Sequence, residues 1–270
     1  MKSLFRTRVH KILGGGDAAE MPFLDHLEEL RWRVLWSLLA LAVGAGLGIW
    51  LVWHFQLLQY LIIPIAPYLP DGKLFYLSVT DPFFITLNLG LAVGAILAAP
   101  VIIYQIWSFV APALTKSEKR AIVPSLYLGV VLFSGGVALA YMYALPMTLH
   151  FFLATIQVDA LAQMITAQLY ISFVVKLLMA FGIAFELPVV ILILSSMGLV
   201  TGGWLAEKRR YAIAVMAVAA AMLTPGDVWT ATVLLMVPLL GLYELSIVLA
   251  RIMERRRARA LAAEPSTETV

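Results

Sequence analysis

The feature that most limits how this chain can fold is a series of apolar runs, several of 20 or more residues, separated by short polar segments. A run of that length can cross the roughly 30 Å hydrocarbon core of a bilayer as a helix. The composition agrees, because 62% of the 270 residues are hydrophobic and only 13% are charged. Soluble domains are about 45–50% apolar and about 25% charged. The sequence therefore predicts one all-α polytopic membrane domain.

Six membrane helices are expected, with the fifth and sixth short. Their approximate ranges are 30–53, 82–109, 120–147, 168–196, 209–223 and 228–250. They form a membrane domain over 21–251, between an N-terminal tail at 1–20 and a C-terminal tail at 252–270. The fifth run has about 13 strictly apolar residues, or about 20 Å of helix. Either its basic end snorkels, or the bilayer thins, or the last two helices form a hairpin that does not fully cross; we favour a short helical hairpin.

Basic residues give the expected orientation. Of the 19 Lys and Arg residues, 17 lie in the N-terminal segment, in the 111–120 and 197–210 loops or in the C-terminal tail. Lys73 is in a loop on the opposite side, and Lys176 is within the fourth span. Because positively charged loops remain in the cytoplasm, both termini are expected to be cytoplasmic. The segment before the first span is too long and too acidic for a cleaved signal or transit peptide.

The sequence offers no enzyme, metal or cofactor motif. It has no Cys, which removes disulfides, thiolate metal sites and Cys nucleophiles, and its four His are scattered. No G-x-S-x-G, H-E-x-x-H or phosphate-loop pattern occurs. We therefore expect neither enzyme activity, nor a cofactor or metal, nor a nucleic-acid partner.

A charged segment precedes the first span. Residues 21–33, MPFLDHLEELRWR, have apolar side chains at the three- and four-residue spacing of an amphipathic helix. Glu29 and Arg33 are one turn apart and can pair, as can Glu28 and Arg31. The segment can be a salt-bridged collar at the membrane surface or a docking surface continuous with the next basic loop.

Two loop acids have a structural alternative to ligand binding. Thr115 and Glu118 have the spacing of a capping box, and a carboxylate there also suits the helix dipole. Asp227 follows a Pro-Gly turn and can cap the sixth helix. Both functions remain open, because a capping carboxylate keeps a second oxygen for a ligand.

One acid lies deep in the fourth span. Glu186 stands two residues before Pro188, and an acid near the bilayer centre costs about 2.5–3.5 kcal/mol on insertion scales. It is expected either to face a polar cavity or a partner, or to serve the fold. Pro188 is expected to kink the helix. Lys176 is about 15 Å away along the helix, too far for a direct pair, and Gln105 is a further polar candidate in the second span.

The segment between the first two spans is too long and too apolar for a free linker. Residues 54–81 carry Pro64 and two further prolines, and a short interfacial helix that forms a cap is expected there. The basic stretch at 255–257 is interpreted as an anchor on the membrane surface.

Four blocks of this sequence resemble the signature blocks of TatC, the multispanning subunit of the twin-arginine protein translocase. The resemblance extends from about residue 22 to 251, in order and with compatible spacing. The blocks are HLEELRWR (26–33), AAPVIIYQIWSFVAPALTKSEKR (98–120), MAFGIAFELPV (179–189) and LTPGDV (223–228).

The resemblance implies a six-helix, glove-shaped core receptor in the prokaryotic cytoplasmic membrane. Such a receptor binds the twin-arginine signal peptides of folded exported proteins and assembles single-span TatA- and TatB-type subunits. It uses the proton-motive force, contacts membrane lipid and self-associates in a multi-copy complex.

The resemblance also assigns residues. Glu29 and Glu118 match the two acids associated with signal-peptide recognition, Arg31 and Phe109 match further positions of that surface, and Glu28 is a local difference that can share the charge. Glu186 matches the intramembrane acid that faces the single-span partners. Pro64 and Asp227 match other important positions, and Gly226 stands where some members have a second Pro.

Two other classes were weighed. A proton-coupled secondary transporter of a small solute would use Glu186 and Lys176 as a midplane site, but the chain has no inverted repeat and only one deep acid. A membrane-embedded hydrolase would need a nucleophile and a base, and no such pair occurs.

Overall fold

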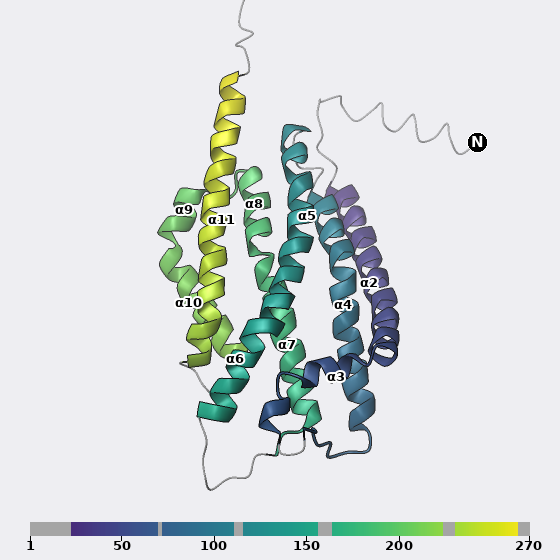
Figure 1. The fold of residues 1–270 in the computed structure, drawn as a ribbon. Helices are drawn as coiled ribbons and strands as arrows, with labels where there is room; N and C mark the ends of the chain where they lie inside the picture. Colours follow the sequence, from purple (N-terminus) through teal and green to yellow (C-terminus); the bar gives the residue numbers. More distant parts are fainter. Residues whose placement is uncertain (1–22, 70–71, 111–115, 156–163, 224–229, 264–270) are drawn as a thin grey trace, which may run out of the picture.

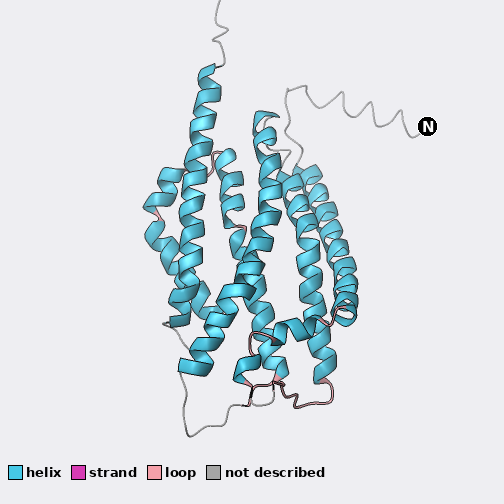
Figure 2. Ribbon diagram, viewed as in Figure 1, coloured by secondary structure: helices cyan, strands magenta, loops and turns pink. Residues whose placement is uncertain are grey.

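The computed structural model describes residues 23–69, 72–110, 116–155, 164–223 and 230–263, which form a bundle of helices (Figures 1 and 2). Five stretches of these residues are long and apolar enough to cross a membrane: Leu27–His54, Asp81–Phe109, Tyr127–Ala154, Ala167–Ser196 and Met236–Arg255. The helices that contain them are α2 (Phe23–His54), α4 (Asp81–Val110), α5 (Lys116–Leu139) with its continuation, α7 (Ala167–Phe185) with α8 (Leu187–Ser196), and α11 (Thr230–Ala263). The predicted all-α membrane class is confirmed.

The fifth expected span corresponds to α10 (Arg209–Leu223). It has 15 residues, which is about 22 Å of helix, and it is not among the five candidate spans. Its expected shortness is confirmed, and the number of six crossings remains a prediction.

The expectation of a short sixth helix is wrong. Helix α11 has 34 residues and runs from Thr230 to Ala263, well beyond the expected end at residue 250. The residues after Arg251 are mostly Arg, Ala, Leu, Met and Glu, which are strong helix formers. Loss of hydrophobicity ends a span, but it does not end a helix.

The third helix also continues past its expected end at residue 147. After α5 comes a π turn, η3 (Ala140–Ala144), then α6 (Leu145–His150) and a second π turn, η4 (Phe151–Thr155). Thr148, the first residue past that end, has a buried side chain whose hydroxyl donates to the carbonyl of Ala144 at 2.7 Å. The first π turn lies just before Pro146, whose missing N–H disturbs the regular α pattern.

The kink expected from Pro188 is present. Helix α7 ends at Phe185 and α8 begins at Leu187. Between them the carbonyl of Glu186 accepts the N–H of both Val189 and Val190 at 3.0 Å. The break follows from the missing N–H of proline.

Helices α2 and α4 approach each other through glycines. Gly44 and Gly48 of α2 face Gly90 and Gly94 of α4, so that a Cβ added at Gly94 would lie 2.5 Å from the Cα of Ala45. Both helices thus carry the G-x-x-x-G spacing that allows close packing in membranes. The motif was readable in the sequence, and our sequence analysis missed it.

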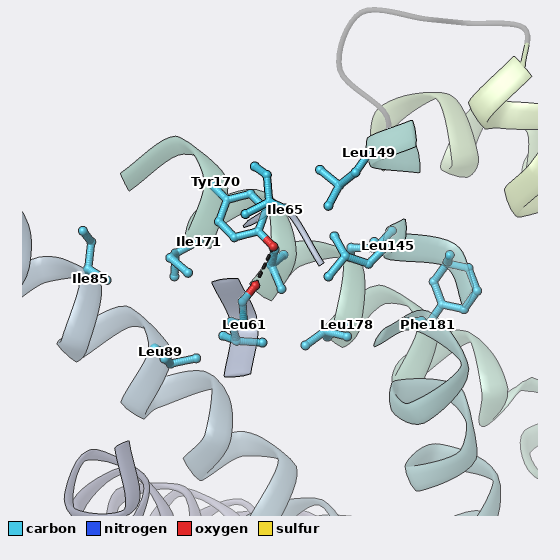
Figure 3. Close-up of a cluster of buried hydrophobic side chains, with 14 of the residues drawn as sticks. Leu61, Ile65, Ile85, Leu89, Leu145, Leu149, Tyr170, Ile171, Leu178 and Phe181 are labelled. Atoms are coloured by element: carbon cyan, nitrogen blue, oxygen red, sulfur yellow. Dashed lines mark hydrogen bonds between the residues drawn. The ribbon is translucent and has the colours of Figure 1, made fainter. Parts of the chain in front are cut away.

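The expected cap between the first two spans is confirmed. Helix α3 (Leu57–Ile62) and the short η1 (Ala66–Tyr68) lie across one end of the bundle (Figure 1). Tyr170 of α7 donates to the carbonyl of Leu61 at 2.6 Å, within a buried cluster that includes Ile65, Leu145 and Ile171 (Figure 3). Tyr141 donates to the carbonyl of Tyr60 at 2.7 Å. The cap is therefore attached to the bundle by two tyrosine hydroxyls and by apolar packing.

The basic segments gather at the opposite end. In Figure 1 the N-terminal end of α2, the C-terminal end of α4, the N-terminal end of α5, the short helix α9 (Gly202–Glu207) and the C-terminal end of α11 all lie away from α3. The first and last described residues are thus at the same end of the bundle.

Candidate functional site

An open groove of about 240 Å³ lies between α2 and α4, in the half of the bundle that carries the basic segments. Most of its lining is apolar. The lining residues are Leu30, Arg33, Val34, Ser37, Leu38, Leu41, Ile102, Gln105, Ile106 and Phe109. Its apolar lining suits an apolar segment of chain.

The polar part of this site is formed by Glu29, Arg33 and Gln105. The Nη2 of Arg33 donates to the Oε1 of Glu29 at 2.9 Å, which confirms the predicted i,i+4 pair. The Nη1 of Arg33 donates to the Oε1 of Gln105 at 3.2 Å, joining α2 to α4. The second oxygen of Glu29, Oε2, is buried and accepts no hydrogen bond in the part of the chain that the structure describes.

Two findings here differ from the sequence analysis. Gln105 was grouped with the deep membrane acid Glu186, whereas it lies at the groove beside Arg33. Arg33 was considered only as a pairing residue, whereas it lines the groove and contacts two helices. The four-residue spacing from Glu29 was the only sequence pattern that pointed to Arg33. Nothing in the sequence pointed to its contact with Gln105, which is 72 positions away in the chain.

The other residues predicted near the signal-peptide surface are placed as follows. Glu28 and Arg31 are exposed on α2 and form no ion pair with each other among the described residues, contrary to the predicted pairing. Phe109 lines the groove at the end of α4. The backbone of Glu118 lies in the first turn of α5, while its side chain and the proposed cap Thr115 lie outside the described residues.

Glu186 occupies the break between α7 and α8. It faces α5, where a Cβ added to Gly129 would lie 3.0 Å from its Oε2. Its Oε1 is buried and has no hydrogen-bond partner among the described residues. Glycine at 129 therefore leaves the space in which this carboxylate sits.

The remaining predicted residues are apart from both sites. Lys176 is exposed on α7 and forms no ion pair with Glu186 in the described part of the chain. Pro64 lies in the turn between α3 and η1, in the cap. Asp227 lies outside the described residues. No group of His, Cys, Asp or Glu that could hold a metal ion occurs among those that are described.

Glu244 has a partner that the sequence analysis did not name. Its Oε1 lies 2.7 Å from the Nε of Arg209, and its Oε2 accepts from the Nη2 of the same residue at 2.8 Å. This two-point contact joins α10 to α11. Both side chains are about half exposed, so the pair contributes little stability.

The arrangement favours binding over catalysis. A carboxylate that already holds a guanidinium lies beside an open apolar groove, and a second carboxylate sits half-buried between helices. The fold and the site together define a polytopic membrane protein with an apolar groove and two carboxylates that lie between helices.

Comparisons with known proteins agree with this class. The profile of the family described as Sec-independent protein translocase protein (TatC) matches residues 25–238. The TatC of Aquifex aeolicus (strain VF5) is 42% identical over 239 residues, 88% of this chain and 98% of that protein. The TatC of Escherichia coli (strain K12) is 38% identical over 232 residues, 85% of this chain and 88% of its own length.

A solved structure described as a crystal structure of the twin arginine translocase receptor TatC matches with a TM-score of 0.75. It is 40% identical and covers 85% of this chain and 99% of its own. The chain belongs to the TatC family. The family is one of protein translocation rather than of enzymes, and this supports the predicted translocase function and not the alternative of a solute transporter.

Proposed function

We propose that this chain is the receptor that binds twin-arginine signal peptides of folded exported proteins. The observation that carries the proposal is the contact between Glu29 and Arg33 beside the groove, because the carboxylate is already shaped to receive a guanidinium. Arginine presents a planar fork that matches a carboxylate at two points, whereas lysine is a single point charge. A site of this kind selects arginine over lysine.

The apolar groove supplies what the charges lack. An exposed ion pair contributes only about 0–1 kcal/mol, which is too little for stable peptide binding. The apolar stretch of a signal peptide in the groove would bury surface at about 25 cal/mol per Å². In this proposal the groove, with Phe109 at its end, provides affinity, and Glu29 and Glu118 with the nearby Glu28 and Arg31 provide selection.

We further propose that Glu186 faces single-span TatA- and TatB-type partners. Support comes from its buried oxygen without a hydrogen-bond partner among the described residues. A polar group of a neighbouring membrane helix that reaches this oxygen would gain more than it could in water, because hydrocarbon offers no other partner. Lys176, Pro64 and Asp227 have no partner assigned in this proposal.

The membrane is proposed to be the prokaryotic cytoplasmic membrane, with both termini in the cytoplasm. Support comes from the distribution of Lys and Arg and from the position of the first and last described residues at one end of the bundle. The receptor is proposed to act in a multi-copy complex, surrounded by lipid, that exports cargo with the proton-motive force.

Peptide crosslinking tests the receptor proposal. A twin-arginine peptide with a photoreactive residue is expected to crosslink near Glu118, and Glu118→Ala, or replacement of the peptide arginines by lysine, should greatly reduce the yield. Glu29→Gln should weaken peptide binding at least about tenfold, since a hydrogen bond to a charged group contributes about 1.5–3 kcal/mol. Glu207→Gln, an exposed acid on α9, is the control. Undiminished crosslinking with both Glu118→Ala and the lysine peptide would refute the proposal.

Co-purification tests the partner proposal. Glu186→Ala is expected to reduce recovery of a tagged single-span partner from detergent extracts while leaving peptide crosslinking intact. Unchanged recovery would contradict it. Loss of the folded protein with this variant would instead support a structural function, and Glu207→Gln again serves as the control.

A further inference from the structure

The carboxylate proposed to read the signal peptide is closed in this structure. One oxygen of Glu29, Oε1, accepts from Arg33 at 2.9 Å. The other, Oε2, is buried away from solvent. The side chain of Glu29 is only 20% exposed and that of Arg33 is 29% exposed. Arg33 already occupies Oε1, so an incoming guanidinium that binds this oxygen of Glu29 competes with Arg33 for it.

The group that closes the site has the same chemistry as the proposed ligand. Arg33 presents one N–H to Glu29 and another to Gln105 of α4. A guanidinium carries five donors in a fixed plane, so Arg33 can release Glu29 and keep the contact with Gln105. The guanidinium of Arg33 would then still donate to Gln105 and would remain at the edge of the groove.

We propose that Arg33 is an internal competitor that occupies Glu29 until a peptide arginine displaces it. The inference rests on the proposed function and adds a specificity residue to it. Arginine replaces arginine at the same carboxylate, so the charge of Glu29 stays paired, and the displaced Arg33 keeps the side-chain oxygen of Gln105 as an acceptor. A peptide without arginine offers no such exchange and leaves the site closed.

The competition has a measurable consequence for affinity. When only a fraction of the receptor has Glu29 open, the apparent Kd equals the intrinsic Kd divided by that fraction. A partly exposed ion pair is worth up to about 1 kcal/mol. Removing Arg33 should therefore tighten peptide binding by about three- to fivefold. A purely structural arginine would give the opposite result, because its loss would loosen the contact between α2 and α4 and weaken binding.

The test measures the Kd of a fluorescent twin-arginine peptide for the full chain in detergent, for four proteins. They are the wild type, Arg33→Gln, Glu29→Gln, and the double variant Glu29→Gln/Arg33→Gln. We expect tighter binding for Arg33→Gln alone and no effect of the same change in the Glu29→Gln background, which is the signature of direct coupling. Equal tightening in both backgrounds would indicate a general charge effect and overturn the proposal, as would unchanged or weaker binding.

Two further variants complete the design. Arg255→Gln removes a positive charge from an exposed position on α11 and is expected to leave the Kd unchanged. If Arg33→Gln does not fold, Arg33→Lys keeps the charge but cannot bridge Glu29 and Gln105 with a planar fork, so it should bind the peptide tighter than the wild type, by a smaller factor. Failure of the wild type to bind any twin-arginine peptide refutes the receptor proposal. If the wild type binds and the Arg33 variants have the same Kd, only this inference is refuted.

Discussion

At the scale of single residues, the most informative atoms are polar, buried and unpartnered. Among the described residues two of them are carboxylate oxygens, Oε2 of Glu29 and Oε1 of Glu186. A polar group that lacks a partner in a low-dielectric environment is costly. These two positions are therefore the ones at which a donor from a peptide or a partner helix would gain most.

Tyr170 at the cap shows the reverse case, in which a buried acceptor is satisfied. We predict that Tyr170→Phe destabilises the protein by about 1–3 kcal/mol, because the buried carbonyl of Leu61 loses its donor. The measurement is thermal unfolding in detergent. Tyr143→Phe, at a side chain that is 67% exposed, is the control and should change stability by less than about 0.5 kcal/mol. Equal stability of the Tyr170 variant and the control would contradict the prediction.

At the scale of elements, the site depends on how closely α2 and α4 pack. The four glycines let the two backbones meet in the middle of the helices, and the groove lies between the same two helices, nearer the basic end. The contact from Arg33 to Gln105 crosses the same pair of helices. Helix packing and site geometry are therefore linked.

A matched pair of substitutions on α2 tests this packing. Gly48→Ala would push a Cβ into the backbone of Gly90 and Gly94, whereas Gly46→Ala meets nothing within 4 Å. We predict that Gly48→Ala costs about 1–3 kcal/mol by overpacking and that Gly46→Ala is neutral or stabilising by up to about 1 kcal/mol. Chemical denaturation in mixed micelles gives both values. A stable Gly48→Ala protein with unchanged peptide binding would contradict the proposed link.

At the scale of the whole molecule, orientation is the main prediction. The chain has no Cys, so single Cys residues can be labelled without background. Val79, two residues before the start of α4, and Glu207, the last residue of α9, are exposed. The start of α4 lies at the cap end of the bundle and α9 lies away from it (Figure 1). We predict that Val79→Cys reacts with an impermeant maleimide in intact cells and that Glu207→Cys reacts only after the membrane is permeabilised. The reverse pattern would overturn the orientation inferred from the positive charges.

A third position tests whether α10 crosses the membrane. Val228→Cys, in the stretch after α10, should label from the same side as Val79 if the chain crosses six times. Labelling from the side of Glu207 would show that α10 does not cross the membrane and would overturn the six-crossing topology. The short length of α10 makes this the most sensitive position in the topology.

Most of the helices could be predicted from the sequence, because hydrophobicity and proline act locally. The range 209–223, the break before Pro188 and the cap between 54 and 81 all correspond to structure. Hydrophobicity and proline positions did not predict that α11 extends to Ala263 or that the third helix continues past Thr148. Helix continuation depends there on propensity and on a local hydroxyl bond, and both override polarity.

The candidate site also has one part that the sequence predicts and another that only the folded structure shows. Local spacing along the chain was enough to pair Glu29 with Arg33 and to single out Glu186 as a costly acid in an apolar run. Only folding brings Gln105 into contact with Arg33. Folding also buries Oε2 of Glu29 and places the carboxylate of Glu186 against Gly129. The physical reason is that membrane insertion and helix formation are decided by a residue and its near neighbours, whereas satisfaction of a buried polar atom depends on which helices pack against it.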